Sequence, residues 1–143
     1  GSHSYKHPDG IKIDLISLSP KFNNSIPEVD HETPLGKLVT EGMVKQHNKF
    51  RMNHDAMSQL MSEHSDFHFK PVVDRNDSDV WEQIVEFTAE HQIPRNKVWV
   101  MPAGSTPEEL IPNYSYVMEE SIRRGYNFTP RPHIVAYGDK RGV

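Results

Sequence analysis

The chain has 143 residues, a formal net charge of -4 and no cysteine. This length fits one domain with a buried core, and the charge leaves no basic surface for a nucleic acid or an anionic membrane. No apolar run approaches the roughly 20 residues that span a bilayer, and without cysteine these residues cannot form disulfides, thiolate metal sites or a thiol nucleophile. We expect a cytoplasmic protein that binds neither nucleic acid nor membrane.

The sequence divides into a four-residue N-terminal segment and one domain. Residues 1–4, Gly-Ser-His-Ser, have the composition of a cloning scar. Residues 5–143 are expected to form a single α/β domain, because apolar blocks alternate with helical patterns throughout.

The first part of the domain predicts a strand, a long loop and a helix. Ile11 to Leu18 is apolar, as is typical of a strand covered on both faces. Pro20 to Pro34 is irregular, and loops of this length are often functional. Apolar residues then recur at helical spacing from Leu35 to about Glu63. Gly36 and Gly42 weaken the start of this pattern, so the firm helix is expected to begin near Val44 or later.

The remaining elements alternate between strands and helices. Strands are predicted at Asp66 to Val73, Lys97 to Met101 and Tyr126 to Tyr137, the last interrupted by two prolines. A helix with caps at residues 77–79 is stopped by Pro94. Another is capped by Ser105 or Thr106, has Pro107 at its first position and ends at Gly125.

This order predicts an α/β fold. Alternating strands and helices form parallel sheets through right-handed crossovers. We expect a parallel sheet of about four strands with three crossover helices, which is half of a partial (β/α) barrel. Such a half leaves an open sheet edge beside residues 11–18. Another domain, a second copy of the chain or solvent-tolerant side chains would have to protect this edge.

Three polar residues follow the first strand at the end where α/β folds bind ligands. Ser17 and Ser19 offer hydroxyls and Lys21 offers a cation, which suits a ribose or a carboxylate. The alternative is an ordinary strand end followed by polar loop residues.

Histidines do not indicate a metal site in this sequence. His64 and His68 are four residues apart but separated by a helix break, and His47 and His54 have no third ligand at a recognisable spacing. No metal ligand and no catalytic residue is therefore predicted. His47 and Arg51, four residues apart, could form a cationic pair that faces a substrate anion, but we interpret them as part of a partly exposed helix face.

The two tryptophans have a structural interpretation, whereas His133 and the C-terminal tail each allow two. Trp81 and Trp99 are interpreted as packing residues. His133 on the last predicted strand could bind a ligand or transfer a proton, or it could be an ordinary histidine. The tail from residue 137 to 143 could fray or fold back over a site.

Taken together, several segments resemble those of one family, the 7-carboxy-7-deazaguanine synthases. These radical S-adenosylmethionine enzymes serve queuosine-type deazapurine biosynthesis. The matching segments occur in the family's order and cover nearly the whole chain. They are residues 15–21 (Leu-Ile-Ser-Leu-Ser-Pro-Lys) with Asn24, Ser25 and Pro27, His47 with Arg51 and Asn53, residues 69–74 (Phe-Lys-Pro-Val-Val-Asp), residues 100–102 (Val-Met-Pro) with Gly104, Thr106, Pro107 and Glu108, residues 128–133 (Phe-Thr-Pro-Arg-Pro-His) and residues 138–143 (Gly-Asp-Lys-Arg-Gly-Val).

The resemblance implies a partial barrel that holds a four-iron, four-sulfur cluster, S-adenosylmethionine and magnesium. It implies conversion of a carboxylated tetrahydropterin into a 7-deazaguanine carboxylate with loss of ammonia. The family's three cluster-binding cysteines lie in its N-terminal half, so the resemblance places this chain in the C-terminal half. Alone it would be inactive, and its partner would be the missing N-terminal half or a second copy across the open edge.

The resemblance also assigns site residues. It places Ser17, Ser19, Lys21, Met101 and Pro102 at the cofactor, and Asn24, His133 and the Val143 carboxylate near the substrate. Two positions depart from the family's pattern. Ala103 stands where many relatives have an acidic residue, and Pro132 replaces a usual leucine. The alternatives are a non-catalytic module that binds a nucleotide or pterin, and a purely structural interaction domain.

Overall fold

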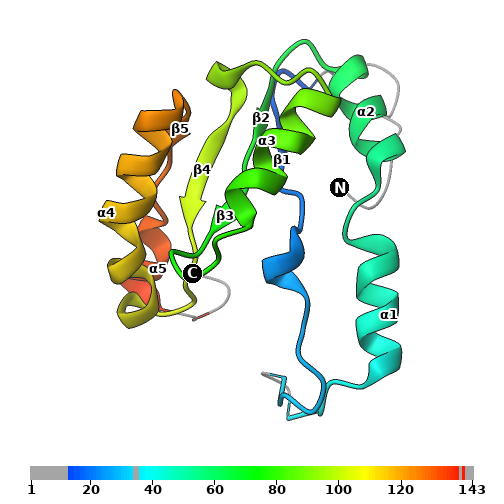
Figure 1. The fold of residues 1–143 in the computed structure, drawn as a ribbon, viewed down its shortest axis with the longest axis vertical. Coiled ribbons are helices and arrows are strands. Elements are labelled where there is room, and N and C mark those ends of the chain that lie inside the picture. Colours follow the sequence, from blue (N-terminus) through cyan, green and yellow to red (C-terminus); the bar gives the residue numbers. More distant parts are fainter. Residues whose placement is uncertain (1–12, 34–35, 139, 141–143) are drawn as a thin grey trace.

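A computed structural model describes residues 13–33, 36–138 and 140 of the chain (Figure 1). Its strands are β1 (Ile16–Leu18), β2 (Phe67–Phe69), β3 (Val72–Val73), β4 (Trp99–Pro102) and β5 (Asn127–Phe128). Its α-helices are α1 (Glu41–Phe50), α2 (His54–Glu63), α3 (Val80–Glu90), α4 (Pro107–Arg124) and α5 (Pro132–Tyr137), and its short 3-10 helices are η1 (Asn23–Ser25) and η2 (Arg95–Lys97). The presumed cloning scar lies outside the described residues.

The strands pair in parallel, as predicted, but they form two small sheets. β1 pairs with β2, while β4 lies between β3 and β5. A single parallel bridge between Phe69 and Val98 links the two sheets. The predicted strand from Asp66 to Val73 is divided into β2 and β3 at Pro71, which has no backbone N–H to donate. The fold class is α/β, with the strand order expected for part of a barrel.

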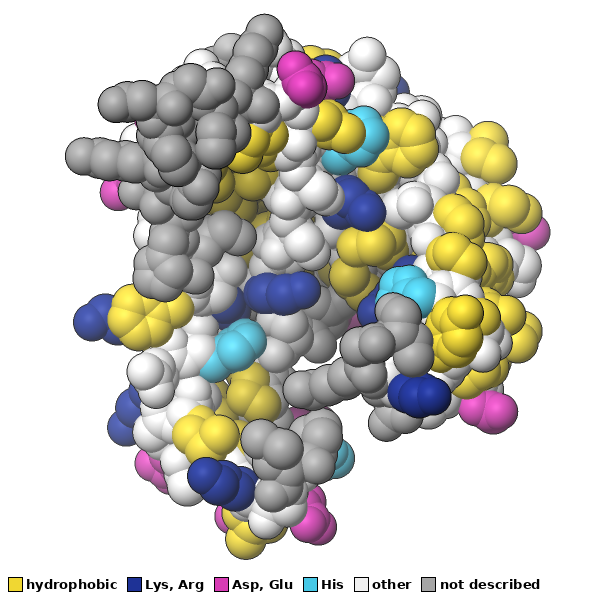
Figure 2. All heavy atoms as spheres, turned by 180° about the vertical axis from the view of Figure 1, so that it is seen from behind, with side chains coloured by type: hydrophobic (Ala, Val, Ile, Leu, Met, Phe, Trp, Pro, Cys, Tyr) yellow, Lys and Arg dark blue, Asp and Glu magenta, His cyan; other side chains and the backbone are white. Residues whose placement is uncertain are grey.

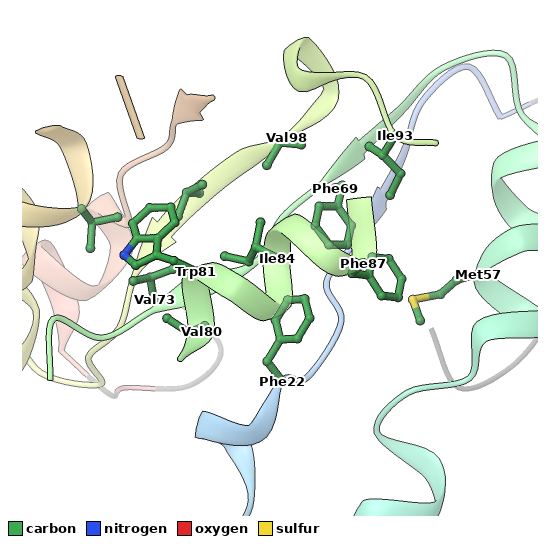
Figure 3. Packing of buried hydrophobic residues seen from close by; sticks show 12 residues of the cluster. Phe22, Met57, Phe69, Val73, Val80, Trp81, Ile84, Phe87, Ile93 and Val98 are labelled. Atoms are coloured by element: carbon green, nitrogen blue, oxygen red, sulfur yellow. The ribbon is translucent and has the colours of Figure 1, made fainter. Parts of the chain in front are cut away.

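The core lies where α3 covers the strands, and aromatic rings from three segments meet there (Figure 3). The rings of Phe69 on β2 and Phe87 on α3 stack at 5.1 Å between centroids. Phe22, from the loop after β1, packs edge-on against both. This contact anchors the loop after β1 to the body of the domain.

The two tryptophans differ in burial. Trp81 is buried in this core and its Nε1 donates to the Tyr116 hydroxyl at 3.2 Å, which confirms its packing role. Trp99 is half-buried and its ring lies 4.7 Å from that of His68.

The long helix α4 begins and ends as the sequence predicts. Thr106 caps it, with Oγ1 accepting from the backbone N–H of Glu109 at 3.4 Å, and Pro107 occupies the first helical position. Gly125 ends it in the left-handed conformation, with φ 72°. α4 packs against β4 and β5, so it holds the second sheet in place.

The prediction of one continuous helix from Leu35 to Glu63 is wrong. This segment is divided into α1 and α2, because the Asn53 side chain accepts from the backbone N–H of Ala56 at 3.0 Å and starts a new helix. α1 begins at Glu41, earlier than expected, since Thr40 caps it by accepting from the Met43 N–H. α1 buries no residue and projects from the body (Figure 1).

The last predicted strand is also wrong beyond its first residues. Only Asn127–Phe128 is a strand, and Pro132–Tyr137 forms α5. Pro132 stands at the first position of this helix, where a fixed φ and a missing N–H cost nothing. None of the helices in the described ranges has both the length and the apolar character required to cross a membrane.

Candidate functional site

A pocket of about 270 Å³ lies at the carboxyl ends of the parallel strands, which is where α/β folds bind ligands. The loops after β1, β3, β4 and β5 all contribute to it. Its lining consists of Pro20, Lys21, Asn24, Ser25, Val72, Asp74, Ala103 and Arg131. Figure 2 shows Lys, Arg and His side chains on both sides of the hollow between the arm that carries α1 and the α4–α5 side.

The loop after β1 is fixed in place by hydrogen bonds to distant segments. Arg51 donates from Nη1 to the Lys21 carbonyl at 2.9 Å and from Nη2 to the Asn23 side chain at 2.7 Å. Asn24 donates from Nδ2 to the Val72 carbonyl at 2.9 Å. These bonds hold Lys21 and Asn24 at the rim of the pocket, next to β3.

The loops after β3 and β4 are joined by one buried amide. Asn113 of α4 accepts from the backbone N–H of Arg75 at 2.9 Å and donates to the Ala103 carbonyl at 3.0 Å. Its Nδ2 also lies 3.5 Å from the Asp74 carboxylate. The other Asp74 oxygen accepts from the backbone and side chain of Asn76. The pocket floor therefore has a defined shape before any ligand binds.

Arg131 brings a half-buried cation to the pocket from the loop after β5. Its Nη1 donates to the Gly104 carbonyl at 2.7 Å, and its backbone N–H donates to the Tyr114 hydroxyl at 3.3 Å. Burial lowers the pKa of Arg131 from the usual guanidinium value. No carboxylate forms an ion pair with it in the part of the chain that the structure describes.

The charges of the site favour an anionic ligand with a polar body. Lys21 is an exposed point charge, whereas Arg131 offers planar N–H groups suited to a carboxylate or phosphate. Asp74 and the Asn24 amide can bind polar groups on the rest of the ligand.

The structure brings some of the predicted site residues into this lining and leaves others beside it. Lys21 and Asn24 line the pocket. Ser17 is exposed on β1, and Ser19 is half-buried just after it. Met101 and Pro102 end β4 one step before Ala103, and Pro102 is fully buried. Ser17, Ser19, Met101 and Pro102 are therefore near the site in the chain but outside the pocket lining.

The two substrate residues predicted near the C-terminus are His133 and Val143. His133 was expected near the end of a strand but lies exposed in the first turn of α5, because Pro132 starts a helix there. It does not line the pocket. Val143 lies outside the described residues.

Residues missed by the sequence interpretation carry much of the site. Arg51 is more than part of an exposed helix face, since its guanidinium fixes the loop after β1. Asn113 has a sequence signal: it falls between Leu110 and Val117 on the buried face of α4. Asp74 directly follows a predicted strand, and both Asp74 and Arg131 fall in segments that carry the family resemblance, but neither is assigned a role there. Only the folded sheet shows that the two loops meet at one edge.

Comparisons with known proteins find relatives in one group. The chain is 30% identical over 134 residues to the 7-carboxy-7-deazaguanine synthase of Rhodopirellula baltica, which covers 94% of this chain and 48% of the relative. It is 29% identical over 132 residues to that of Halobacterium salinarum, with 89% of this chain and 49% of the relative covered. It is 39% identical over 74 residues to the 7-carboxy-7-deazaguanine synthase of Pyrobaculum aerophilum, with 52% of this chain and 32% of the relative covered.

No family model matches the chain, and no solved structure matches it either. These relatives agree with the resemblance that the matching segments indicate. The chain covers about half of each relative, which is consistent with a C-terminal half. The chain is thus similar to the 7-carboxy-7-deazaguanine synthases over nearly all of its own length and spans about half of theirs.

Proposed function

We propose that this chain is the ligand-binding C-terminal half of a 7-carboxy-7-deazaguanine synthase-like radical S-adenosylmethionine enzyme. Such an enzyme converts a carboxylated tetrahydropterin into a 7-deazaguanine carboxylate with loss of ammonia. The similarity to the named relatives supports the family, and the pocket at the carboxyl ends of the strands supports a small-molecule substrate.

One observation carries the proposal furthest: Arg131 lines the pocket as a half-buried cation with no carboxylate partner among the described residues. Partial burial removes some of the water around this charge, so pairing with an anionic ligand is favourable. The substrate's carboxylate supplies such a partner, with Lys21 adding a second positive charge at the rim. Asn24 and Asp74 then orient the polar ring of the substrate.

The cofactor would bind beside this pocket. We assign the S-adenosylmethionine contacts to Ser17, Ser19 and Lys21 after β1 and to Met101 and Pro102 at the end of β4, as the resemblance implies. Bound there, the cofactor would supply the radical that begins the reaction. The substrate roles of His133 and Val143 rest on the resemblance alone.

The iron–sulfur cluster does not fit this chain. Such a cluster is held by cysteine thiolates, and these 143 residues contain none. Magnesium is bound through one or two carboxylates together with water. Asp74 is the one carboxylate in the pocket lining, so it is the residue that would hold the ion if magnesium bound in this half. We therefore assign the cluster to the other half and expect this chain alone to be inactive.

The free edge of β1 is the proposed place for the partner. In the described part of the chain β1 pairs only with β2. Its other edge leaves backbone groups that another strand can pair with, and Leu15 beside it is 46% exposed. The N-terminal half is the proposed occupant, with a second copy as the alternative.

Calorimetric titration of the chain with the carboxylated tetrahydropterin tests the proposed pocket. Arg131→Gln should weaken binding about 10-fold or more, because a charge-assisted hydrogen bond is worth about 2 kcal/mol. The matched control is Arg123→Gln, an exposed arginine paired with Glu120 on α4. Equal affinity in the Arg131 variant and the unsubstituted chain would contradict the proposal.

Reconstitution separates the enzyme from the alternative, a non-catalytic pterin- or nucleotide-binding module. The chain is combined with the N-terminal half of the Rhodopirellula baltica relative, iron, sulfide, S-adenosylmethionine and a reductant. Formation of the deazaguanine carboxylate supports the enzyme. Ligand binding by the combined protein without product formation supports the binding module.

A further inference from the structure

Two histidines and a glutamate converge where the start of α2 meets the end of α3. His54 is the first residue of α2, Glu90 is the last residue of α3, and His91 follows it. Nδ1 of His54 lies 2.9 Å from Nε2 of His91 and 3.5 Å from Oε1 of Glu90. One ligand-type atom from each residue falls within 4.8 Å of the others. The pocket at the strand ends shares no residue with this cluster.

Neighbouring side chains hold the two imidazoles in this orientation. Nδ1 of His91 lies 3.1 Å from the Ser58 hydroxyl, so its Nε2 is the atom turned toward His54. The buried ring of Phe87 lies behind both histidines, 4.3 Å from the His91 ring and 5.4 Å from the His54 ring. A ligating histidine commonly has its second nitrogen fixed by a hydrogen bond in this way.

We propose that His54, Glu90 and His91 form a binding site for a divalent transition-metal ion of the Zn²⁺ type. Two imidazoles and a carboxylate suit zinc better than magnesium or calcium, which prefer oxygen ligands alone. Zinc–nitrogen bonds of about 2.0 Å in a tetrahedron place ligand atoms about 3.3 Å apart. The distances from His54 Nδ1 to His91 Nε2, 2.9 Å, and to Glu90 Oε1, 3.5 Å, are close to this value.

The surroundings accept a cation at this position. The cluster lies between the C-terminal end of α3, which carries the negative end of one helix dipole, and the N-terminal end of α2, which carries the positive end of another, so the two dipoles offset each other. His54 and Glu90 are exposed, so solvent can reach the site and water can complete the coordination. Without a metal ion, the short nitrogen–nitrogen contact is a hydrogen bond between the histidines. With the ion bound, both nitrogens are ligands and the ion connects α2 to α3.

Competition between the chain and a chromogenic zinc chelator measures the affinity. All variants are made in a background that carries His3→Asn and His7→Asn. These two substitutions remove histidines outside the described residues, so that they do not compete for zinc. One zinc ion should bind per chain, and His54→Gln and His91→Gln should each weaken binding more than 10-fold. Ser58→Ala should weaken it about 10-fold by releasing the His91 ring. The control is His31→Gln, an exposed loop histidine, which should leave the affinity unchanged.

Thermal unfolding gives a second readout that does not depend on the chelator. Zinc should raise the Tm of the background protein and should not raise that of the His54 or His91 variant, because only the folded state holds the ligands together. Circular dichroism without metal checks that the variants are folded. Zinc binding of equal strength in the His91 variant, or a loss of binding in the His31 variant, would overturn the site.

Discussion

At the scale of the residue, Asn113 shows how one buried polar side chain can shape a binding pocket. It lies on the apolar face of α4, is 4% exposed, and joins the loops after β3 and β4. Its burial could be read from the helical spacing of Leu110 and Val117. Its partners could not, because Arg75 and Ala103 come close to it only when the strands are paired.

Replacing this residue tests its structural role. Asn113→Ala should lower the free energy of unfolding by about 2 kcal/mol, since it leaves the Arg75 N–H and the Ala103 carbonyl without their partner. Urea unfolding followed by circular dichroism measures the change. Asn96→Ala, at an exposed asparagine in η2, is the control and should change stability by less than about 0.5 kcal/mol. A similar small effect at Asn113 would show that the loops do not depend on it.

A second residue-scale prediction concerns pH. Lys97 forms a hydrogen bond and an ion pair with Asp66, and this contact lowers the pKa of the Asp66 carboxyl. The folded protein therefore keeps this carboxylate charged at a lower pH than the unfolded chain does. The resulting stabilisation is present above the ordinary carboxyl pKa, near pH 4, and is lost as the pH falls through the lower pKa of the folded state.

Urea unfolding between pH 7 and pH 3 measures this dependence. Asp66→Asn and Lys97→Met should each be less stable than the unsubstituted chain at pH 7. Both differences should narrow as the pH falls below about 4. Differences that stay constant over the whole range would mean that the pair does not contribute through its charge.

At the scale of the element, a helix boundary is predicted where its cap stands at the edge of an apolar pattern, and it is missed where the cap falls inside one. The start of α4 at Thr106 and its end at Gly125 are predicted, since both residues have a local physical reason to cap a helix. The division between α1 and α2 is missed, because Asn53 falls within a continuous helical pattern. α5 is missed because a proline within an apolar run predicts an interrupted strand, whereas Pro132 begins a helix.

The turn between β4 and α4 provides an element-scale prediction. Gly104 has φ 141°, and a Cβ atom there would lie 2.6 Å from the Leu110 backbone. Gly104→Ala should therefore destabilise the fold by about 2 kcal/mol or more and displace the carbonyl that accepts from Arg131. Differential scanning calorimetry measures the loss.

The matched control is another glycine-to-alanine change. Gly42→Ala, in α1, meets no atom closer than 3.7 Å and should stabilise the helix by about 0.5 to 1 kcal/mol. Destabilisation of equal size at Gly42 and Gly104 would contradict the explanation by close approach.

At the scale of the whole molecule, the sequence predicts where the site lies better than which residues form it. Alternation of strands and helices predicts a parallel fold with ligands at the strand ends, and a pocket is found there. Of the predicted residues, Lys21 and Asn24 line it. Arg131 and Asp74 lie in segments that carry the family resemblance, but no site role is predicted for them, because loops far apart in the chain converge only after folding.

The pocket at the strand ends is proposed to bind the carboxylated substrate of a synthase-like enzyme. Titrating the carboxylated tetrahydropterin into ¹⁵N-labelled protein, followed by NMR, tests it most directly. We expect chemical-shift changes at the Asn24 side-chain amide, the Arg131 guanidinium and the backbone of Asp74 and Ala103. The absence of any shift, or shifts confined to the exposed apolar pocket of α4 and α5 around Ile111 and Val135, would contradict the claim.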